Sequence, residues 1–209
     1  MATEEQISVK GSLLLGLLKY VGEKLGAEGR DNLLKSLDNE DQAVFFKSAD
    51  SSEPNIISIA EWYPHKTFEN FMDAIVREIG KGDINLCKEI GRWSAEKDLD
   101  PEKGIYRFYA TEAFKTDVTL VYKTSTSVIW EQMYNKGKLE AEEIEKGKIV
   151  VFKLTDFPEV TEAGCLLIGA WIERTSQIVS GAEIKVEAKY KPAPGIDCEF
   201  QMEVKGTLR

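Results

Sequence analysis

The side chains that could carry nucleophilic, acid–base or metal chemistry are few and scattered. His65 is the only histidine, and Cys87, Cys165 and Cys198 stand far apart. No Cys-x-x-Cys, His-x-x-x-His or His-Glu-x-x-His pair supplies ligands for a transition metal. With one histidine there is one candidate base, and no Gly-x-Ser-x-Gly turn supplies a nucleophile for it to activate. We therefore expect no metal site and no enzyme activity.

The remaining charged groups favour no phosphate or acid–base chemistry. Neither Gly-x-Gly-x-x-Gly nor Gly-x-x-x-x-Gly-Lys-Ser/Thr occurs, so no phosphate-binding loop is predicted. Carboxylate pairs such as Glu142 with Glu143, and Asp98 with Asp100, lie in charged stretches that we expect to be solvated. A net charge of −9 argues against a nucleic-acid partner and against binding to an anionic membrane surface.

The chain has the features of a cytoplasmic protein. Its N-terminus starts acidic and lacks the order of a secretory signal, a basic segment followed by an apolar one. The longest uncharged apolar stretch, residues 163–172, is about half of the roughly 20 residues of a spanning helix, so no transmembrane segment is expected. Three widely spaced cysteines form no disulfide framework, and we expect them to be reduced.

The first two thirds are predicted to be helical. Helical spacing of leucines covers residues 12–24, and Gly26 and Gly29 end that run. Further helices are predicted after Asp31, over residues 41–49, after Pro64, after Asp83 and after Pro101. Residues 116–134 are rich in β-branched side chains, yet their apolar residues fit a helical stripe, and we interpret them as helix.

The last third predicts an antiparallel sheet. Residues 138–144 and 148–154 flank a Glu-Lys-Gly turn, a long helix spans residues 159–179 before Gly181, and residues 183–189 and 198–204 alternate apolar with polar side chains. Such alternation puts one face of a sheet on the core and the other in water. The predicted fold class is α+β: an N-terminal helical layer packed on one face of a C-terminal four-stranded antiparallel sheet that ends β-β-α-β-β. We expect residues 1–8 to be disordered and residues 9–209 to form a single domain.

Three segments resemble a superfamily of ligand-binding and scaffold domains. The ending VEAKYKPAPGIDCEFQMEV is similar to the close of 4-vinyl-reductase-type domains, and FENFMDAIVREIGKGDINLCKEIGRWSAEKDL resembles the paired helices of Bet3-type TRAPP subunits. The β-β-helix-β-β order matches the shared fold, which includes the haem-dependent nitric-oxide-sensing (H-NOX-like) domains. The opening VKGSLLLGLLKYV and the segment EWYPHKTFENFMDAI look closer to an uncharacterised family abundant in myxobacteria.

The resemblance also bears on cofactors. In Bet3-type proteins a cysteine of the paired helices is acylated, and Cys87 falls at a similar position, although a small buried hydrophobe is the alternative reading. The haem sensors hold iron on a histidine of a mid-chain helix together with a Tyr-x-Ser-x-Arg clamp. Here His65 lies outside that helix and the clamp is missing. The resemblance therefore implies no haem, and an acyl chain or another apolar ligand instead.

Two hypotheses follow. The first is a non-catalytic sensor or scaffold module that binds an apolar small molecule or lipid between the long helix and the helices that bear Cys87 and Tyr106. The second is a protein-interaction module without a ligand, acting as a homodimer in a signalling or trafficking assembly. In both a protein partner is expected. Aromatic side chains pack well in cores, and a minority of them could line the cavity. The residues predicted for the ligand site are Cys87, Trp93, Tyr106, Tyr109, Tyr122, Trp130 and Trp171.

Overall fold

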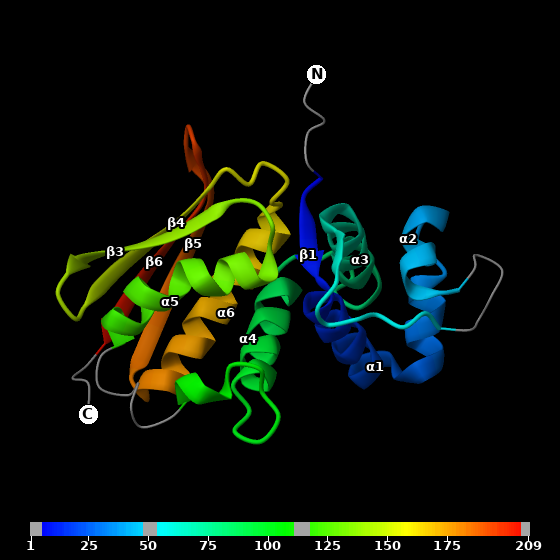
Figure 1. Cartoon of the computed structure of the whole chain (residues 1–209), viewed down its shortest axis with the longest axis horizontal. Helices are drawn as coiled ribbons and strands as arrows, with labels where there is room; N and C mark the ends of the chain where they lie inside the picture. Colours follow the sequence, from blue (N-terminus) through cyan, green and yellow to red (C-terminus); the bar gives the residue numbers. More distant parts are fainter. Residues whose placement is uncertain (1–5, 48–53, 111–117, 206–209) are drawn as a thin grey trace. The chain divides into compact units, whose positions relative to one another are not determined.

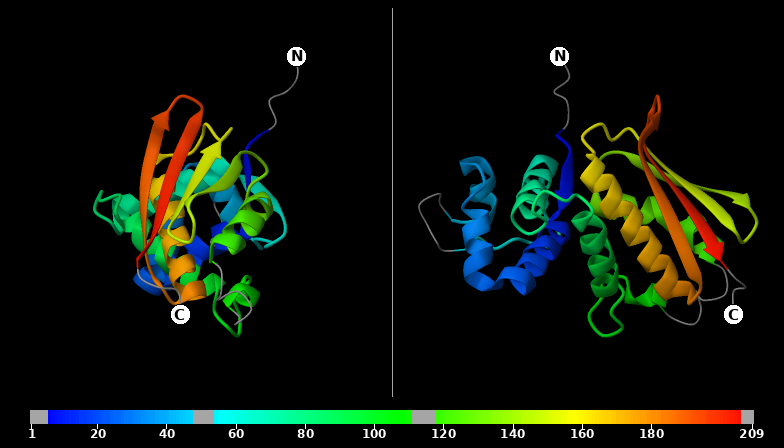
Figure 2. Two further views of the ribbon diagram at one scale, coloured as in Figure 1. Left: turned by 90° about the vertical axis from the view of Figure 1, so that its left-hand side faces the viewer. Right: turned by 180° about the vertical axis from the view of Figure 1, so that it is seen from behind.

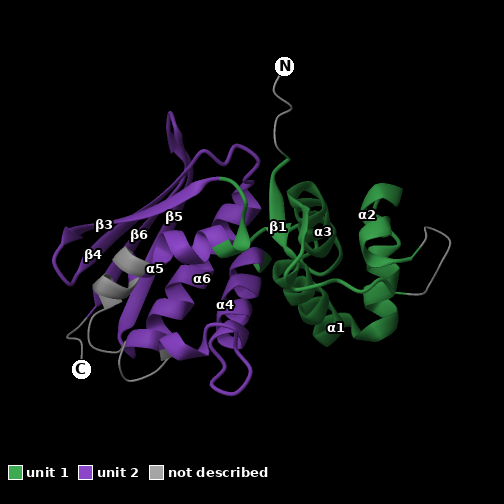
Figure 3. Cartoon of the chain, in the orientation of Figure 1, with its two compact units in different colours: residues 1–86, 132–136 green, residues 87–131, 137–209 purple. Residues whose placement is uncertain are grey.

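The computed structural model describes residues 6–47, 54–110 and 118–205, and the chain divides into two compact units. Unit 1 consists of residues 1–86 and 132–136, and unit 2 of residues 87–131 and 137–209 (Figure 3). Each unit is described by itself below.

Unit 1 is a small helical body with a two-stranded ribbon. Its elements are β1 (Ser8–Lys10), α1 (Gly11–Leu34), α2 (Asn39–Phe45), β2 (Trp62–Pro64) and α3 (His65–Glu78). β1 and β2 pair antiparallel, and Val9 lies opposite Tyr63. The buried apolar residues of α1 and α3 form the core, with Leu14, Tyr20, Phe71 and Ile75 among them. Ser8, in the segment expected to be disordered, is the first residue of β1.

Two local predictions for unit 1 are confirmed and one is refined. Pro64 stands directly before the first residue of α3, where its missing N–H leaves no helical hydrogen bond unmade. The break at Gly26 is present, with φ at 72°. The helix resumes at once, however, so the two predicted helices are the two arms of α1. A glycine adopts this positive φ without steric cost, which explains a sharp bend with no intervening loop.

Unit 2 confirms the predicted α+β class. It contains α4 (Leu86–Asp98, except Leu86), a 3₁₀ turn η1 (Arg107–Ala110), most of α5 (Val118–Met133), β3 (Lys138–Glu145), β4 (Ile149–Thr155), α6 (Glu162–Ser180), β5 (Glu183–Ala193) and β6 (Ile196–Lys205). The four strands form one antiparallel sheet in the order β3-β4-β6-β5. The predicted β-β-α-β-β run is therefore correct, and β3 and β5 are its edge strands.

One face of this sheet is apolar and covered by helices. Phe152, Phe200 and Met202 are fully buried on it. The Tyr122 ring of α5 packs edge-on against Phe152, with ring centroids 5.2 Å apart, and α6 runs along β5 (Figures 1 and 2). The alternate residues of the strands carry mostly Lys and Glu, so the sheet has the wet and dry faces that the alternation predicted.

The ends of α6 are fixed by local signals. The Thr161 hydroxyl accepts a hydrogen bond from Gly164 N at 3.0 Å, which satisfies one of the free amides of the first turn. Gly181, with φ at 68°, closes the helix in the left-handed conformation, at the residue where the helix was predicted to end.

The helix expected after Pro101 is wrong, because only the short 3₁₀ turn η1 forms there. The Asp100 carboxylate accepts hydrogen bonds from the backbone amides of Glu102 and Lys103, each at 2.9 Å, which makes a turn instead of a helix start. Gly104 packs so tightly that a Cβ there would lie 2.3 Å from Asp98 O. Within the described ranges, no helix has the length and apolar character needed to cross a membrane.

Candidate functional site

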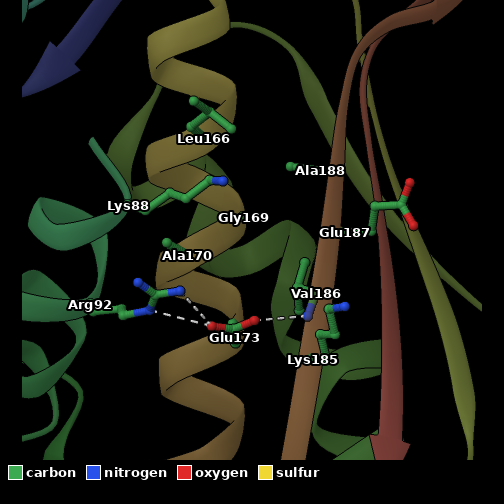
Figure 4. A pocket seen from close by; sticks show the side chains of 10 residues that line it. All are labelled: Lys88, Arg92, Leu166, Gly169, Ala170, Glu173, Lys185, Val186, Glu187 and Ala188. Atoms are coloured by element: carbon green, nitrogen blue, oxygen red, sulfur yellow. Dashed lines mark hydrogen bonds and ion pairs between the residues drawn. The ribbon is translucent and has the colours of Figure 1, made fainter. Parts of the chain in front are cut away.

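Unit 2 holds a pocket of about 350 Å³ between α4, α6 and the edge strand β5 (Figure 4). A volume near the lower end of the usual range for ligand sites suits a small molecule. The lining residues are Lys88, Arg92, Leu166, Gly169, Ala170, Glu173, Lys185, Val186, Glu187 and Ala188.

The floor of the pocket is a small-residue surface of α6. A Cβ added to Gly169 would lie 2.9 Å from Ala188 Cβ, and one added to Gly91 of α4 would lie 2.3 Å from Leu167 O. The absence of side chains at these two positions lets α6 approach β5 on one side and α4 on the other. The floor of the pocket therefore consists of backbone and small side chains that are closely packed.

Ion pairs tie the walls together. Arg92 of α4 donates to the Glu173 carboxylate of α6 from Nη2 at 3.0 Å and Nε at 3.3 Å. The second carboxylate oxygen of Glu173 accepts from Val186 N of β5 at 3.0 Å (Figure 4). One carboxylate thus bridges all three elements, and its charge is balanced by Arg92.

The free edge of β5 presents backbone groups to the pocket. Val186 N donates to Glu173, and Ile184 O accepts from Gln177 Nε2 at 2.8 Å, so the backbone groups of these even-numbered residues point away from β6. In an antiparallel strand, the backbone groups of successive residues point alternately toward one neighbouring strand and the other side. The N–H and C=O of Ala188 therefore point away from β6 as those of Ile184 and Val186 do, toward the free edge of β5. No hydrogen bond to these two groups is made by any part of the chain that the structure describes.

Lys88 is the cation that α4 adds to the lining beside Arg92. It lies in the first turn of that helix and is half-buried. Its side chain reaches from α4 toward α6, whereas the carboxylate of Glu187 projects from the opposite side of β5 (Figure 4). Over residues 6–47, 54–110 and 118–205, no side chain forms an ion pair with Lys88. The pocket therefore combines an apolar floor with an uncompensated positive charge.

The predicted ligand residues form several separate groups, of which one is a cluster. Tyr106 packs edge-on against Trp171, with ring centroids 6.2 Å apart, and Tyr109 lies 6.3 Å from Tyr106. Trp171 Nε1 donates to Asp98 Oδ2 at 2.9 Å, and Tyr106 N donates to Asp98 O at 2.8 Å. This aromatic cluster surrounds the end of α4 and packs as core.

The other predicted residues have contacts of their own. The Tyr122 hydroxyl bonds the Ser176 hydroxyl beneath the sheet, and Trp130 packs edge-on against Phe157 at 5.3 Å. Cys87 is fully buried on α4, and Trp93 of the same helix has Lys97 Nζ 5.3 Å above its ring. None of the seven predicted residues lines the α4–α6–β5 pocket.

Sequence reasoning missed the polar residues of the pocket because they resemble an ordinary solvated surface. One signal was available. Glu173 interrupts the apolar run of α6, and a charge there requires a partner from a neighbouring element. Lys88 and Arg92 are spaced four residues apart and so share one face of α4, but nothing in the sequence shows that this face borders a strand edge.

Asp98 corrects the expectation that its carboxylate is solvated. Burial raises the pKa of Asp98 from 3.8 to about 6, and the hydrogen bond from Trp171 only partly offsets this effect. Burial, followed by the neighbouring charge of Asp98, also raises the pKa of the Tyr106 hydroxyl. The aromatic cluster therefore encloses a carboxyl group that resists ionisation.

Cys165 of α6 and Cys198 of β6 are buried free thiols. Their mutual hydrogen bond, with burial second, raises the pKa of the Cys198 thiol. A raised pKa keeps a thiol protonated and poor as a nucleophile. Among the described residues, no group of three or more His, Cys, Asp or Glu side chains is placed to hold a metal ion.

Comparison with known proteins places the fold among H-NOX domains. No protein-family model matches the chain, and no curated protein matches it by sequence. A solved structure of a Cs H-NOX mutant matches with a TM-score of 0.66 at 14% identity, covering 94% of this chain and 97% of that one. An oxygen-binding H-NOX domain related to soluble guanylate cyclases gives 0.62 at 13%, covering 96% and 97%.

An unliganded Fe(II) H-NOX mutant from K. algicida gives a TM-score of 0.65 at 11% identity, covering 95% of this chain and 98% of that one. Identities this low establish the fold alone. The likeness to vinyl-reductase-type domains, TRAPP subunits and the myxobacterial family stays a resemblance of sequence pattern.

Because haem is named for the H-NOX family, its fit to this chain can be tested on His65. His65 is fully buried in unit 1, and its Nε2 lies 3.3 Å from the Glu69 carboxylate one turn further along α3. The rings of Phe68 and Tyr134 pack around it at 6.0 and 6.2 Å. An axial ligand needs a ring nitrogen directed at the iron, and this one is directed at a carboxylate of its own helix. With Nε2 directed at Glu69, this nitrogen of the only histidine does not fit a haem ligand.

Proposed function

We propose that this chain is a non-catalytic sensor module of H-NOX fold that binds a small molecule in the α4–α6–β5 pocket. The observation that carries the proposal is the pocket itself, which joins an apolar floor to the ammonium of Lys88 and to a free strand edge. A few polar groups converging on an apolar concavity are the usual make-up of a ligand site.

The position of α6 supports a sensing role. Its Glu173 contacts both α4 and β5, Arg174 binds Glu96 of α4 at 2.8 Å, and Gln177 binds β5. A ligand in the pocket touches all three elements. Its binding energy therefore favours whichever packing of α6 accommodates it, which is the thermodynamic requirement for a ligand to shift a protein between states.

The lining residues support binding without catalysis. The ten residues of the lining include no histidine, cysteine or hydroxyl side chain, and the Glu173 carboxylate is already bonded to Arg92 and Val186 N. Lys88 is present, but no described acid or base is bonded to it to form a catalytic pair. General acid–base and nucleophilic catalysis need a group free to accept or donate a proton at the reacting atom.

A ligand screen with structural mapping tests the proposal. Thermal-shift assays of the full chain against small metabolites should reveal compounds that raise Tm, since a ligand at 100 times its Kd stabilises by about 2.7 kcal/mol. Amide resonances of ¹⁵N-labelled protein should then move at Gly169 and Ala188. Hits that perturb only residues of unit 1 would show that the pocket is not the site.

A second candidate, the protein-interaction module, is favoured by the surface of unit 1. Ile56, Ile59 and Trp62 expose 86%, 64% and 43% of their surface, close together in sequence. Exposed large apolar side chains mark interaction sites when they are grouped. Light scattering of the wild type and of Ile59→Ser tests it: a dimer that the substitution dissociates supports this function, and a wild-type monomer contradicts it. We also propose that the protein is cytoplasmic and that it acts with a protein partner.

A further inference from the structure

We propose that the ligand of the α4–α6–β5 pocket is a small monocarboxylate with a compact apolar part. This inference rests on the proposed function and specifies its ligand class. It follows from three features of the pocket: the sign of the free charge, the free backbone donor and the space available.

The free charge of the pocket is positive. Arg92 and Glu173 neutralise each other through hydrogen bonds of 3.0 and 3.3 Å. Lys185 and Glu187, two exposed lining residues of β5, carry opposite charges that offset each other. Lys88 is left as the charge directed at the pocket that no described residue pairs (Figure 4). A half-buried ammonium beside apolar surface gains most from an anion, because solvent screens the pair less there.

The strand edge supplies a second contact for such an anion. The N–H of Ala188 points away from β6 into the pocket and lies on the wall opposite α4. Carboxylate oxygens accept from an ammonium and from a backbone N–H at once, and charged acceptors make the stronger hydrogen bonds. Lys88 and Ala188 together thus suit the two oxygens of one carboxylate.

The volume of the pocket and its charge limit which ligands it can bind. About 350 Å³ accommodates a small molecule, and Leu166, Gly169 and Ala170 form a floor for a short apolar group. Arg92 is already bonded to Glu173, so the second charge of a dianion such as a phosphate or dicarboxylate would lose water without finding a second cation equivalent to Lys88. The preferred ligand is therefore singly charged.

Binding of simple probes by the full chain tests the inference. Butyrate and benzoate, with their neutral amides and with succinate as a dianion, are titrated at up to about 10 mM by NMR. Lys88→Met keeps the length of the side chain and removes its charge, and we expect it to weaken carboxylate binding about tenfold. Lys146→Met is the matched control, because it removes an equal charge from an exposed position in the turn between β3 and β4, outside the lining of the pocket; we expect less than a twofold change.

Each outcome separates the ligand class from the site. Carboxylates that bind more tightly than their amides and than succinate, and that depend on Lys88 but not on Lys146, support the inference. Amides that bind as well as the acids, moving Gly169 and Ala188, overturn the carboxylate and leave the pocket as a binding site. If acids and amides both fail to move these resonances, the carboxylate is again overturned. The pocket is then decided by the metabolite screen: a hit there retains the proposed function, and no hit there ends it.

Discussion

His65 illustrates how a single contact decides what a residue can do. The sequence marked it as the one candidate base or ligand, and its place just after Pro64 favoured an exposed first-turn residue without a catalytic role. The expected exposure is wrong, because His65 is fully buried. The structure buries it against Phe68 and Tyr134 and directs Nε2 at Glu69. Which neighbours a lone histidine meets depends on long-range packing, and no spacing in the sequence encodes it.

We expect haem added to the purified protein to give no histidine-dependent spectrum. The His65 ring nitrogen is directed at Glu69, and releasing it would leave a carboxylate buried without a partner. Absorption spectra of wild type and His65→Ala after incubation with haem should therefore match. A Soret band in the wild type that the substitution abolishes would contradict this prediction.

Asp98 predicts a pH dependence of stability. Its pKa is raised from 3.8 to about 6, so folded and unfolded chains are both protonated below pH 3.8. As the pH rises from 3.8 to 6 the unfolded chain loses this proton first, and stability falls by up to about 3 kcal/mol. Asp98→Asn removes this loss and keeps an oxygen that can accept the Trp171 hydrogen bond. The variant should gain stability at pH 7.5 and none near pH 4, as measured by denaturant unfolding; Asp100→Asn, at an exposed turn, is the comparison. An equal gain at both pH values would contradict the assigned cause.

At the scale of elements, periodicity predicted most of the structure. The alternation in residues 183–189 and 198–204 identified two paired strands, and the helical stripe correctly outweighed β-branched residues in α5. The miss after Pro101 has a local cause, since Asp100 turns its carboxylate to two backbone amides and competes with helix formation. The pocket escaped prediction because it depends on which face of α4 meets which edge of β5, and single-element periodicity does not contain that information.

Two glycines in different surroundings are predicted to respond oppositely to substitution by alanine. Gly91 is at the close contact of α4 with α6, and Gly22 has open space around it. A Cβ at Gly91 would lie 2.3 Å from Leu167 O, so Gly91→Ala should destabilise the fold by about 1–3 kcal/mol. A Cβ at Gly22 of α1 would meet no described atom within 4 Å, so Gly22→Ala should stabilise by about 0.5–1 kcal/mol through higher helix propensity. Chemical denaturation measures both. A neutral Gly91→Ala would show that the helices do not pack this closely.

At the scale of the whole molecule, nothing in the sequence marks a division into two units. The chain passes from unit 1 to unit 2 after Leu86, returns for residues 132–136 and leaves again, so no linker rich in Pro, Gly or Ser marks a boundary. We expected one domain over residues 9–209, and that expectation stays a prediction; the contacts within the chain cluster into two compact units. Segments that interleave in this way can be assigned only once tertiary contacts are known.

Every residue that lines the pocket belongs to unit 2, so loosening the core of unit 1 should leave the pocket intact. Phe71→Leu reduces a fully buried side chain of α3. In ¹H–¹⁵N spectra the indole signal of Trp62 in unit 1 should move, while those of Trp93 and Trp171 in unit 2 stay in place. Movement of all three signals would show that the two cores are coupled.

The bonds from Glu173 and Gln177 to β5 have a consequence for aggregation. An edge strand with open backbone groups can recruit a strand from another molecule, and fibril growth begins in this way. Here two side chains of α6 occupy the groups of Ile184 and Val186 that such a recruit would need. The helix α6, which forms the floor of the pocket, thus blocks edge-to-edge polymerisation. Replacing Gln177 or Glu173 with alanine would remove part of that protection.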